Sequence, residues 1–364
     1  MPSLPRIARV PHTSKVPEAC PHCDSRVLTR RGTRKKKLEI VQLWRCASCK
    51  RVFTPGPRAL HNKTYPLRMI LSALTDYNTG YSLQETAARL KKKSNRSVSA
   101  STITTWLDEY KPHCTYRRLR ADGLGRFPAT QTMRSIKLYH RQIYAYAYHR
   151  PKLEFVRNGT LDDKRVGDTR FALLADFLEN IPTTCPHDLF RREDDPKARA
   201  SQATPRWADA SRITVNSKRN AATETAALII PAVGNNKLRH ETLQHFMLAS
   251  DSVTVAVEIP IWLTERDISA LEQQHGIELV PRVSAAERSI TGHIDFLQVR
   301  NGCVHVLDYK PDARTNKPIA QLTIYALALT RLVPGLKLFD IKCAWFNENE
   351  YCEMFPRTLF ARPA

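Results

Sequence analysis

Three short stretches toward the C-terminus carry side chains that could do hydrolytic chemistry together. They are Gly292-His293-Ile294-Asp295, Asp308-Tyr309-Lys310, and the segment from Gln321 to Tyr325. Apolar residues surround Asp295 and Asp308, which predicts two strands that each deliver one carboxylate. Asp308 and Lys310 are two residues apart, so their side chains point to the same face of a strand. Two carboxylates beside an ammonium group predict a divalent-metal site in which the lysine positions a water molecule.

The order of these motifs resembles that of the PD-(D/E)xK nucleases, in particular their RecB-like branch. In that branch a glycine precedes an Asp-bearing strand, and Asp-x-Lys and Gln-x-x-x-Tyr follow. The matching residues here are Gly292, Asp295, Asp308, Lys310, Gln321 and Tyr325. The resemblance covers roughly residues 212–360. It implies an α/β restriction-endonuclease-like domain with a mixed central sheet, and hydrolysis of DNA phosphodiester bonds.

The resemblance also implies a role for each motif residue. Asp295 and Asp308 would hold Mg²⁺ or Mn²⁺, because hard oxygen ligands favour these ions over zinc. Lys310 would orient the water or stabilise the pentavalent phosphate. Gln321 and Tyr325 are four apart on one helix face and would hold the DNA phosphate or the water around the metal.

A third protein ligand stays open among three candidates. Residues 212–248 are predicted to be helical, with a break near residues 231–234. RecB-like nucleases place a histidine ligand on a helix before the Asp strand, and His240 lies on the part of this helix from 238 to 248. His245 is about 140° further around that helix, so both histidines would not reach one metal. Glu241 could supply a helix-borne carboxylate instead. Glu258 interrupts the apolar strand predicted for residues 253–263 and needs a partner, either the catalytic site or a nearby arginine.

The cysteines near the N-terminus predict a second kind of metal site. Four of the nine form two Cys-x-x-Cys pairs separated by 22 residues: Cys20, Cys23, Cys46 and Cys49. This spacing matches a tetrahedral four-thiolate Zn²⁺ site in a zinc ribbon over residues 18–57. We expect the zinc to be structural, because so small a module could hardly fold without it. The other cysteines are isolated, and Cys303, Cys343 and Cys352 are too widely spaced to suggest an iron–sulfur cluster.

The net charge of +22 indicates a polyanionic partner. Residues 1–120 hold 25 Lys and Arg against 7 Asp and Glu, so most of the excess lies in the first third. No apolar run has the length of a membrane span, and no signal-peptide core is visible. We therefore expect a cytoplasmic protein, nucleoid-associated if prokaryotic, that meets nucleic acid and no membrane. DNA is the favoured partner, and a homodimer stays open because nucleases that cut both strands often act as dimers.

The basic N-terminal third is predicted to capture DNA. On the ribbon the residues expected to grip phosphates are Arg30, Arg31, Arg34, Lys35, Lys36 and Lys37. Pro66, a capping box at Ser82 and a start at Ser99 or Ser101 predict three short helices within residues 58–112. Such a unit is typical of helix-turn-helix domains, in which the start of the third helix meets bases or phosphates. That start carries Ser99, Ser101, Thr102 and Thr105.

Residues 18–112 together resemble the zinc-ribbon and helix-turn-helix start of several prokaryotic transposases. A three-helix bundle without a DNA role is the alternative for the helical part. The predicted protein is thus multidomain: a flexible tail (1–17), the zinc ribbon, the all-α helix-turn-helix, a helical connecting region (113–211) and the nuclease domain (212–364). Within the connecting region, the aromatic and basic residues of 135–148 favour a packed helix over a surface that stacks the bases of a single strand.

Two other functions compete with a DNA nuclease. One is a catalytically inactive, transposon-derived DNA-binding regulator, which the intact Asp295, Asp308 and Lys310 disfavour. The other is an RNA-processing factor, because charge alone does not separate DNA from RNA. Endonuclease or exonuclease action, polarity, specificity and pathway are left open by the sequence.

Overall fold

The computed structural model describes residues 17, 19–35, 40–54, 65–160, 168–191, 199–203, 205, 207–208, 215–233, 236–279 and 288–360. The flexible tail predicted for residues 1–17 lies outside the described residues except for Pro17. Within the described part, no helix is both long enough and apolar enough to cross a bilayer.

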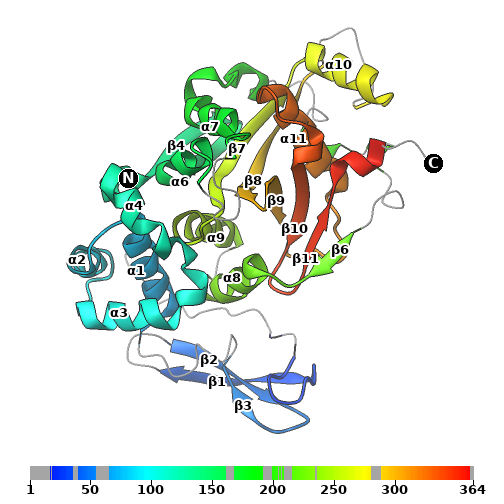
Figure 1. Ribbon diagram of the computed structural model, residues 1–364. Coiled ribbons are helices and arrows are strands. Elements are labelled where there is room, and N and C mark those ends of the chain that lie inside the picture. Colours follow the sequence, from blue (N-terminus) through cyan, green and yellow to red (C-terminus); the bar gives the residue numbers. More distant parts are fainter. Residues whose placement is uncertain are drawn as a thin grey trace.

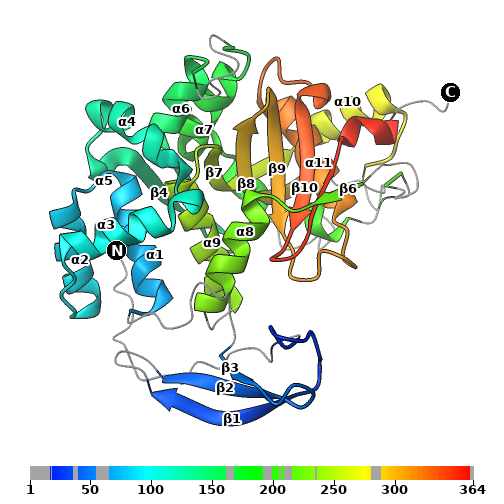
Figure 2. The ribbon, with the colours of Figure 1, turned by 60° about the horizontal axis from the view of Figure 1, so that its bottom comes forward.

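The N-terminal module is a small antiparallel sheet of β1 (Leu28–Lys35), β2 (Ile40–Cys46) and β3 (Val52–Phe53). Its buried cluster consists of Cys20, Trp44, Cys46 and Phe53. Figures 1 and 2 show this sheet set apart from the rest of the chain. Because only a few side chains are buried, hydrophobic stabilisation of this module is small. The module therefore needs a further cross-link, such as a metal ion.

Three helices follow: α1 (Leu67–Thr79), α2 (Leu83–Ser94) and α3 (Ala100–Glu109). The capping box forms as expected, because Ser82 accepts from the Glu85 backbone and the Glu85 side chain accepts from Ser82. Ser99 caps α3. Ile103, Trp106 and Leu107 are buried, so the apolar face of α3 packs inward.

The three-helix unit shares its core with the C-terminal part of the chain. Helix α1 packs against α9 (Asn236–Ser250), and the buried Asn78 amide donates to the Ser250 hydroxyl over 3.2 Å. One continuous apolar cluster runs from Ile70 and Trp106 to Phe246 and Phe296. Helix α9 therefore sits between the helical unit and the sheet, as Figure 1 shows.

Part of the predicted helical connecting region is a strand hairpin instead. After α4 (Arg120–Arg126) and α5 (Ala129–Thr132), β4 (Met133–His140) pairs antiparallel with β5 (Gln142–His149). The helix expected for residues 135–148 was wrong. Tyr144, Tyr146 and Tyr148 alternate with small residues, which is the period of a strand, and β5 continues the central sheet through Ala147 opposite Val257. The region becomes helical again at α6 (Arg150–Arg157) and α7 (Ala172–Thr184).

The central sheet is mixed, as predicted. Its remaining strands are β6 (Asn216–Lys218), β7 (Thr254–Leu263), β8 (Ile290–Arg300), β9 (Cys303–Tyr309), β10 (Ile341–Phe346) and β11 (Tyr351–Met354). The described strands follow the order β4-β5-β7-β8-β9-β10-β11-β6, in which only β9 and β10 pair parallel. A helix was expected throughout residues 212–248 with a break near 231–234. The break is present between α8 (Ala221–Ile229) and α9, but residues 216–218 form an edge strand.

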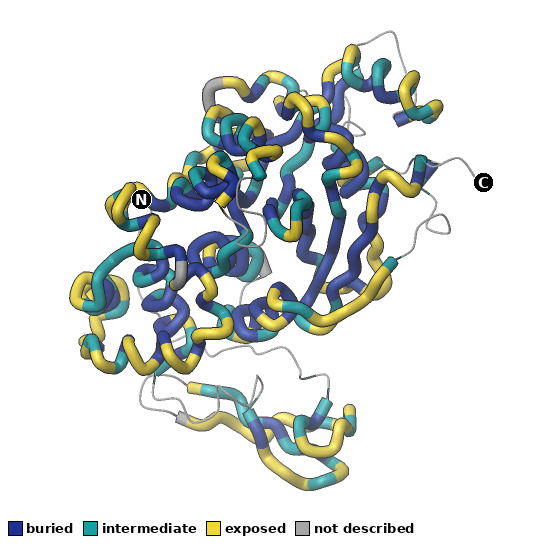
Figure 3. The backbone as a smooth tube through the Cα atoms, viewed as in Figure 1, coloured by how far each residue is buried: buried dark blue, intermediate teal, exposed yellow. Residues whose placement is uncertain are grey.

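Helices cover both faces of the sheet, so its central strands are buried (Figure 3). Helix α11 (Ile319–Leu332) packs on β7, β9 and β10 from one side, and α9 packs on β5 and β7 from the other. Neighbouring residues of β9 divide between these layers: Val306 joins the α11 side and Leu307 the α9 side. Helix α10 (Glu265–His275) follows β7 directly. This two-sided packing fixes the register of β7, β8 and β9.

Candidate active site

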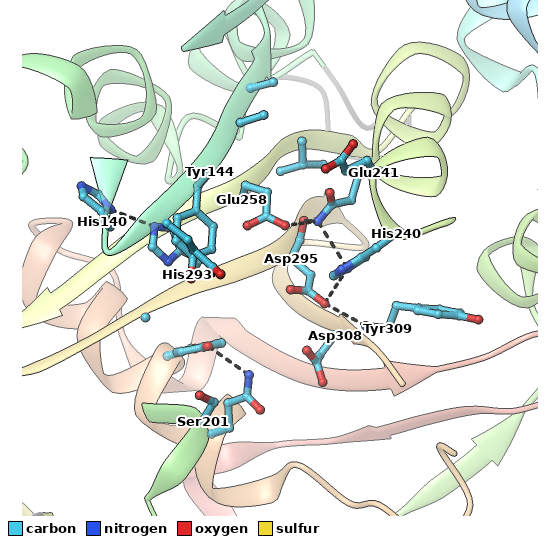
Figure 4. A pocket seen from close by; sticks show the side chains of 18 of the residues that line it. His140, Tyr144, Ser201, His240, Glu241, Glu258, His293, Asp295, Asp308 and Tyr309 are labelled. Atoms are coloured by element: carbon cyan, nitrogen blue, oxygen red, sulfur yellow. Dashed lines mark hydrogen bonds and ion pairs between the residues drawn. The ribbon is translucent and has the colours of Figure 1, made fainter. Parts of the chain in front are cut away.

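Three neighbouring strands each place a carboxylate at the same level of the sheet. In the β7–β8 ladder, Val257 pairs with Phe296 and Ile259 with Ile294, so Glu258 lies opposite Asp295. In the β8–β9 ladder, Phe296 pairs with Leu307, so the next step places Asp295 opposite Asp308. Opposite residues in antiparallel strands have Cβ atoms about 5 Å apart. Glu258, Asp295 and Asp308 form what we call the carboxylate row (Figure 4).

The backbone conformation of β7 is irregular at Glu258, the first residue of the carboxylate row. Glu258 has φ +53°, in the left-handed region that L-residues other than Asn and Asp rarely adopt. Val257 packs into the α9-side core and Ile259 into the α11-side core, so the usual alternation of the strand is interrupted between them. Such local strain costs on the order of 1–3 kcal/mol and is concentrated at functional sites. The lone carboxylate of this strand is thereby held beside Asp295.

Helix α9 brings a histidine and an amide to the row. His240 Nε2 lies 3.0 Å from Asp295 Oδ2. One turn further along the helix, the buried Gln244 amide donates to Glu258 Oε1 over 2.7 Å and to the Asp295 carbonyl over 3.3 Å. The possible ligand atoms of His240, Glu258 and Asp295 all lie within 4.8 Å of one another. Two of the three candidates for a third ligand therefore meet Asp295, whereas Glu241 is exposed on the pocket wall.

Asp308 and Lys310 form an ion pair on one face of β9, as their spacing predicted. Lys310 Nζ lies 2.9 Å from Asp308 Oδ2. The contact lacks hydrogen-bond alignment, so the buried Asp308 Oδ2 has no hydrogen-bond partner among the described residues. Asp295 Oδ2 accepts from the Tyr309 backbone N–H over 3.1 Å. The ammonium of Lys310 is the ion-pair partner of the buried Asp308 Oδ2, and a divalent ion bound at the row would compete with it for this oxygen.

The electrostatics of the row fit a cation. Burial and the neighbouring Asp295 raise the pKa of Asp308 well above its usual range, and the same two causes raise the pKa of Glu258 to about 7. Burial opposes a charged His240, but Asp295 outweighs it and raises the pKa of His240 to about 9. Ionising all three carboxylates would place more negative charge in the row than His240 and Lys310 neutralise, which is why the pKa values of Asp308 and Glu258 are raised, and a bound divalent ion would relieve that repulsion. Carboxylate oxygens with one imidazole match the donor set of a divalent metal ion.

Gly292 is required by the aromatic ring that packs on it. A Cβ atom at Gly292 would lie 2.6 Å from Tyr325 Cε1, closer than carbon atoms approach. Tyr325 is buried, and burial raises the pKa of its hydroxyl. The Gln321 amide donates to Tyr325 Oη over 3.0 Å. Gly292 and Tyr325 are therefore in direct contact, and α11 packs closely against β8 at this point.

All of the predicted catalytic residues line one cavity of about 1050 Å³, which has room for a polymer segment. They are Glu258, Asp295, Asp308, Lys310, Gln321 and Tyr325, with His240 beside them. Gln244 and Arg199, which belong to none of the predicted motifs, also line this cavity, as does Tyr144 from the aromatic stretch that was expected to be a packed helix. The spacing of His240 and Gln244, one helical turn apart, was a signal that could have found Gln244.

A family model described as the PD-(D/E)XK nuclease superfamily matches residues 136–352, which is more than half of the chain and contains the whole carboxylate row. The chain belongs to the PD-(D/E)XK nuclease superfamily. The match begins inside β4, so this superfamily domain includes strands that the sequence analysis assigned to a connecting region. No curated protein and no solved structure matches the chain.

Membership of this superfamily supports nuclease activity. PD-(D/E)XK proteins are generally nucleases that act on nucleic acid with divalent metal ions, and the donor set described above fits such an ion. The row offers carboxylate oxygens that could hold a metal ion, Lys310 is a cation beside them, and the cavity is open to a ligand.

The four ribbon cysteines form a cluster of a different kind. Cys20 Sγ lies 3.6 Å from Cys49 Sγ, and Cys23 Sγ lies 3.5 Å from Cys46 Sγ. Zinc bonds of about 2.3 Å in a tetrahedron require sulfur atoms about 3.8 Å apart. A hydrogen bond from the Cys49 backbone helps to lower the pKa of Cys46 to about 6. At Cys23 the backbone hydrogen bond at Ser25 is outweighed by burial and the neighbouring thiols, which raise its pKa to about 12, so a metal ion is needed for all four thiols to ionise together. The cluster can hold zinc, and it is compatible with a zinc ribbon.

The predicted DNA-binding residues lie on exposed surfaces where the structure describes them. Arg30, Arg31 and Arg34 are exposed on β1. Lys36 and Lys37, and the side chain of Lys35, lie outside the described residues. At the start of α3, Ser99, Ser101 and Thr105 are exposed, and the half-buried Thr102 hydroxyl lies 2.9 Å from Ser99 Oγ.

Proposed function

We propose that this protein is a Mg²⁺- or Mn²⁺-dependent deoxyribonuclease of the RecB-like branch, which hydrolyses phosphodiester bonds of DNA that its N-terminal third captures. The observation that carries the proposal is the convergence of the carboxylate row, His240 and Lys310 in one cavity. A buried Asp308 paired with Lys310 is costly to maintain and is expected where the pair serves the chemistry, which favours an active enzyme over an inactive regulator.

Each residue of the site has a distinct task in this proposal. A divalent ion, when bound, lowers the pKa of a water molecule and offsets negative charge that develops on the phosphate. Asp295, Asp308 and His240 supply the ligands. Glu258 adds a carboxylate that Gln244 orients through its hydrogen bond. Three carboxylates and one imidazole favour Mg²⁺ or Mn²⁺ over the softer ions.

Lys310 acts on the reacting groups. The Asp308 carboxylate, 2.9 Å away, raises the pKa of the Lys310 ammonium against the opposing effect of burial, so the lysine stays charged. A fixed ammonium in a partly enclosed cavity stabilises negative charge that builds up at the phosphate. Gln321 and Tyr325 line the same cavity and hold the phosphate or the surrounding water.

DNA capture falls to the ribbon and the three-helix unit. A structural zinc on the four cysteines holds the ribbon, and exposed Arg30, Arg31 and Arg34 contact phosphates without reading sequence. The three helices act as a helix-turn-helix, with the exposed hydroxyls of Ser99, Ser101 and Thr105 at the DNA. We propose that the protein works in the cytoplasm, associated with the nucleoid if it is prokaryotic, because that is where its DNA substrate would lie.

The test is a cleavage panel with the full-length protein on linear, circular and single-stranded DNA and on RNA, with Mg²⁺, Mn²⁺ or EDTA. We expect DNA cleavage that needs the metal and is lost in Asp308→Ala and Lys310→Ala. Asp340→Asn is the matched control, because Asp340 precedes β10 at the end away from the row and its carboxylate contacts the Lys337 backbone. Its activity should equal that of the wild type.

The same panel separates the competing functions. DNA binding without cleavage under any metal condition would contradict the nuclease and favour a DNA-binding regulator. Cleavage restricted to RNA would favour an RNA-processing factor. Cleavage that survives in Asp308→Ala would place the chemistry elsewhere in the chain or in a contaminant.

A further inference from the structure

A second cluster of metal-ligating side chains lies beside the catalytic cavity. It joins His140 at the end of β4, Cys185 directly after α7, and His187 in the 3-10 helix His187–Phe190. His140 Nε2 lies 2.8 Å from His187 Nδ1 and 3.9 Å from Cys185 Sγ. His140 and Cys185 are buried and His187 is half-buried. None of these residues belongs to the carboxylate row or to the ribbon.

We propose that His140, Cys185 and His187 form a structural zinc site within the nuclease fold, with a solvent oxygen as the fourth ligand. Two imidazole nitrogens and one thiolate are donors that select zinc over Mg²⁺ or Mn²⁺. The half-buried position of His187 leaves access for the solvent ligand. The protein then carries zinc at two places, the ribbon and this site, both distinct from the hard-ion site of the carboxylate row.

The distances are close to those that zinc requires. Tetrahedral zinc with bonds of about 2.0–2.3 Å separates two nitrogens by about 3.3 Å and a nitrogen from a sulfur by about 3.6 Å. The observed separations of 2.8 and 3.9 Å differ from these by a few tenths of an ångström. The ribbon sulfurs, at 3.5–3.6 Å, lie nearer their ideal separation, so the two histidine nitrogens must move apart by about 0.5 Å to admit the ion.

The surroundings of His140 orient its Nε2 toward the proposed metal. Its other nitrogen, Nδ1, lies 2.9 Å from His293 Nε2. A proton on Nδ1, donated to His293, leaves the Nε2 lone pair free for a metal, which is the usual arrangement of a ligating histidine. Phe190 stacks on the His140 ring at 3.7 Å between centroids, and Tyr144 stacks on His293 at 3.6 Å. The ring is therefore fixed before any metal binds.

The proposed zinc ion would link the edge strand β4 to the part of the sheet that carries the carboxylate row. Through His140 it joins the end of β4 to the end of α7, and through the His140–His293 contact it reaches β8 two residues before Asp295. Figure 4 shows His140, His293 and Tyr144 beside the carboxylate row. A chain of hydrogen-bonded histidines without metal is the competing explanation, in which Cys185 is a neutral thiol packed in the hydrophobic core.

The test measures zinc per chain in the full-length protein. The parent carries His240→Ala and Asp295→Ala, so that the carboxylate row cannot retain zinc. After growth with zinc and exhaustive dialysis, we expect two zinc ions in the parent and one after adding Cys185→Ser, His187→Ala or the ribbon change Cys46→Ser. Adding Cys303→Ser, the control at a half-buried cysteine outside both clusters, should leave two.

One zinc per chain in the parent, unchanged by Cys185→Ser, would overturn the proposal. X-ray absorption at the zinc edge of the parent gives a result that does not depend on variants at the new site. Histidine nitrogen together with sulfur around zinc is expected, because the four-cysteine ribbon alone supplies only sulfur. A spectrum with sulfur ligands alone would exclude the second site. Neither readout depends on nuclease activity.

Discussion

The ribbon and the centre of the sheet assemble their ligand clusters in opposite ways. The ribbon takes four sulfurs from two short turns, Cys20 to Cys23 and Cys46 to Cys49, that a small sheet holds together. The candidate active site takes the carboxylate row from three strands and His240 from a helix, and these residues are spread over the chain from 240 to 308. A local cluster depends on its metal to fold, whereas a distributed cluster depends on the fold to exist.

This difference predicts that damage to one cluster leaves the other intact. Loss of a carboxylate should stop the chemistry while the ribbon keeps its zinc. Loss of a ribbon cysteine should weaken capture while bound DNA is still cut.

The largest expected effect is that of Asp308→Ala on the chemical step. A metal ion contributes several kcal/mol to such a reaction, so we expect cleavage to fall by about 10³-fold. Single-turnover cleavage with saturating DNA measures this step without the contribution of capture. Zinc content should stay that of the wild type; a simultaneous loss of zinc would show that the clusters are not independent.

The next effect is that of Cys46→Ser on capture. Without its fourth thiolate the ribbon loses zinc and its fold, so DNA affinity should fall at least about tenfold as phosphate contacts disappear. Affinity is measured by fluorescence anisotropy with an uncleavable duplex in Ca²⁺. At saturating DNA the cleavage rate should match that of the wild type. A rate as low as that of Asp308→Ala would contradict the separation of capture from chemistry.

Gly292→Ala should perturb the packing that supports the row. The added methyl group meets Tyr325 at 2.6 Å, so the ring or the strand must shift, and we expect a loss of about 1–3 kcal/mol in the free energy of unfolding. Chemical denaturation measures this change. Gly125→Ala is the matched control, because a Cβ atom there meets nothing within 4 Å. Equal stabilities of the two variants would contradict the described contact.

The smallest effect is that of replacing Arg30, Arg31 and Arg34 with Ala together. Each phosphate contact contributes about one unit to the slope of log affinity against log salt, so the slope should become shallower by about two to three. The affinity difference should vanish at high salt, and cleavage at saturating DNA should not change. A salt dependence identical to that of the wild type would remove β1 from the DNA-binding surface.

The spacing of the motif residues encodes part of their geometry, so their relative positions could be predicted from the sequence. Asp308 and Lys310 are two residues apart and their side chains meet on one face of the sheet. Gly292 contacts Tyr325 where β8 packs against α11. The mixed sheet and the break between α8 and α9 were also predicted. The catalytic roles of the motif residues stay predictions.

Other features depended on long-range packing and were missed. The hairpin of β4 and β5 was interpreted as a helix because its aromatic and basic residues outweighed the alternation of Tyr144, Tyr146 and Tyr148. His140 meets Cys185 and His187 only through the fold, although Cys185-Pro186-His187 repeats the local pattern of Cys20-Pro21-His22. The choice between His240, Glu241 and Glu258 required the packing of α9 on β7.

The most direct test of the account is Mn²⁺ binding to the full-length protein, followed by electron paramagnetic resonance. We predict one Mn²⁺ per chain in the wild type and in Cys46→Ser, and loss of that ion in both Asp295→Asn and Asp308→Asn. Mn²⁺ that binds equally well to the two Asn variants, or no bound Mn²⁺ in the wild type, would contradict the claim that the carboxylate row is the catalytic metal site.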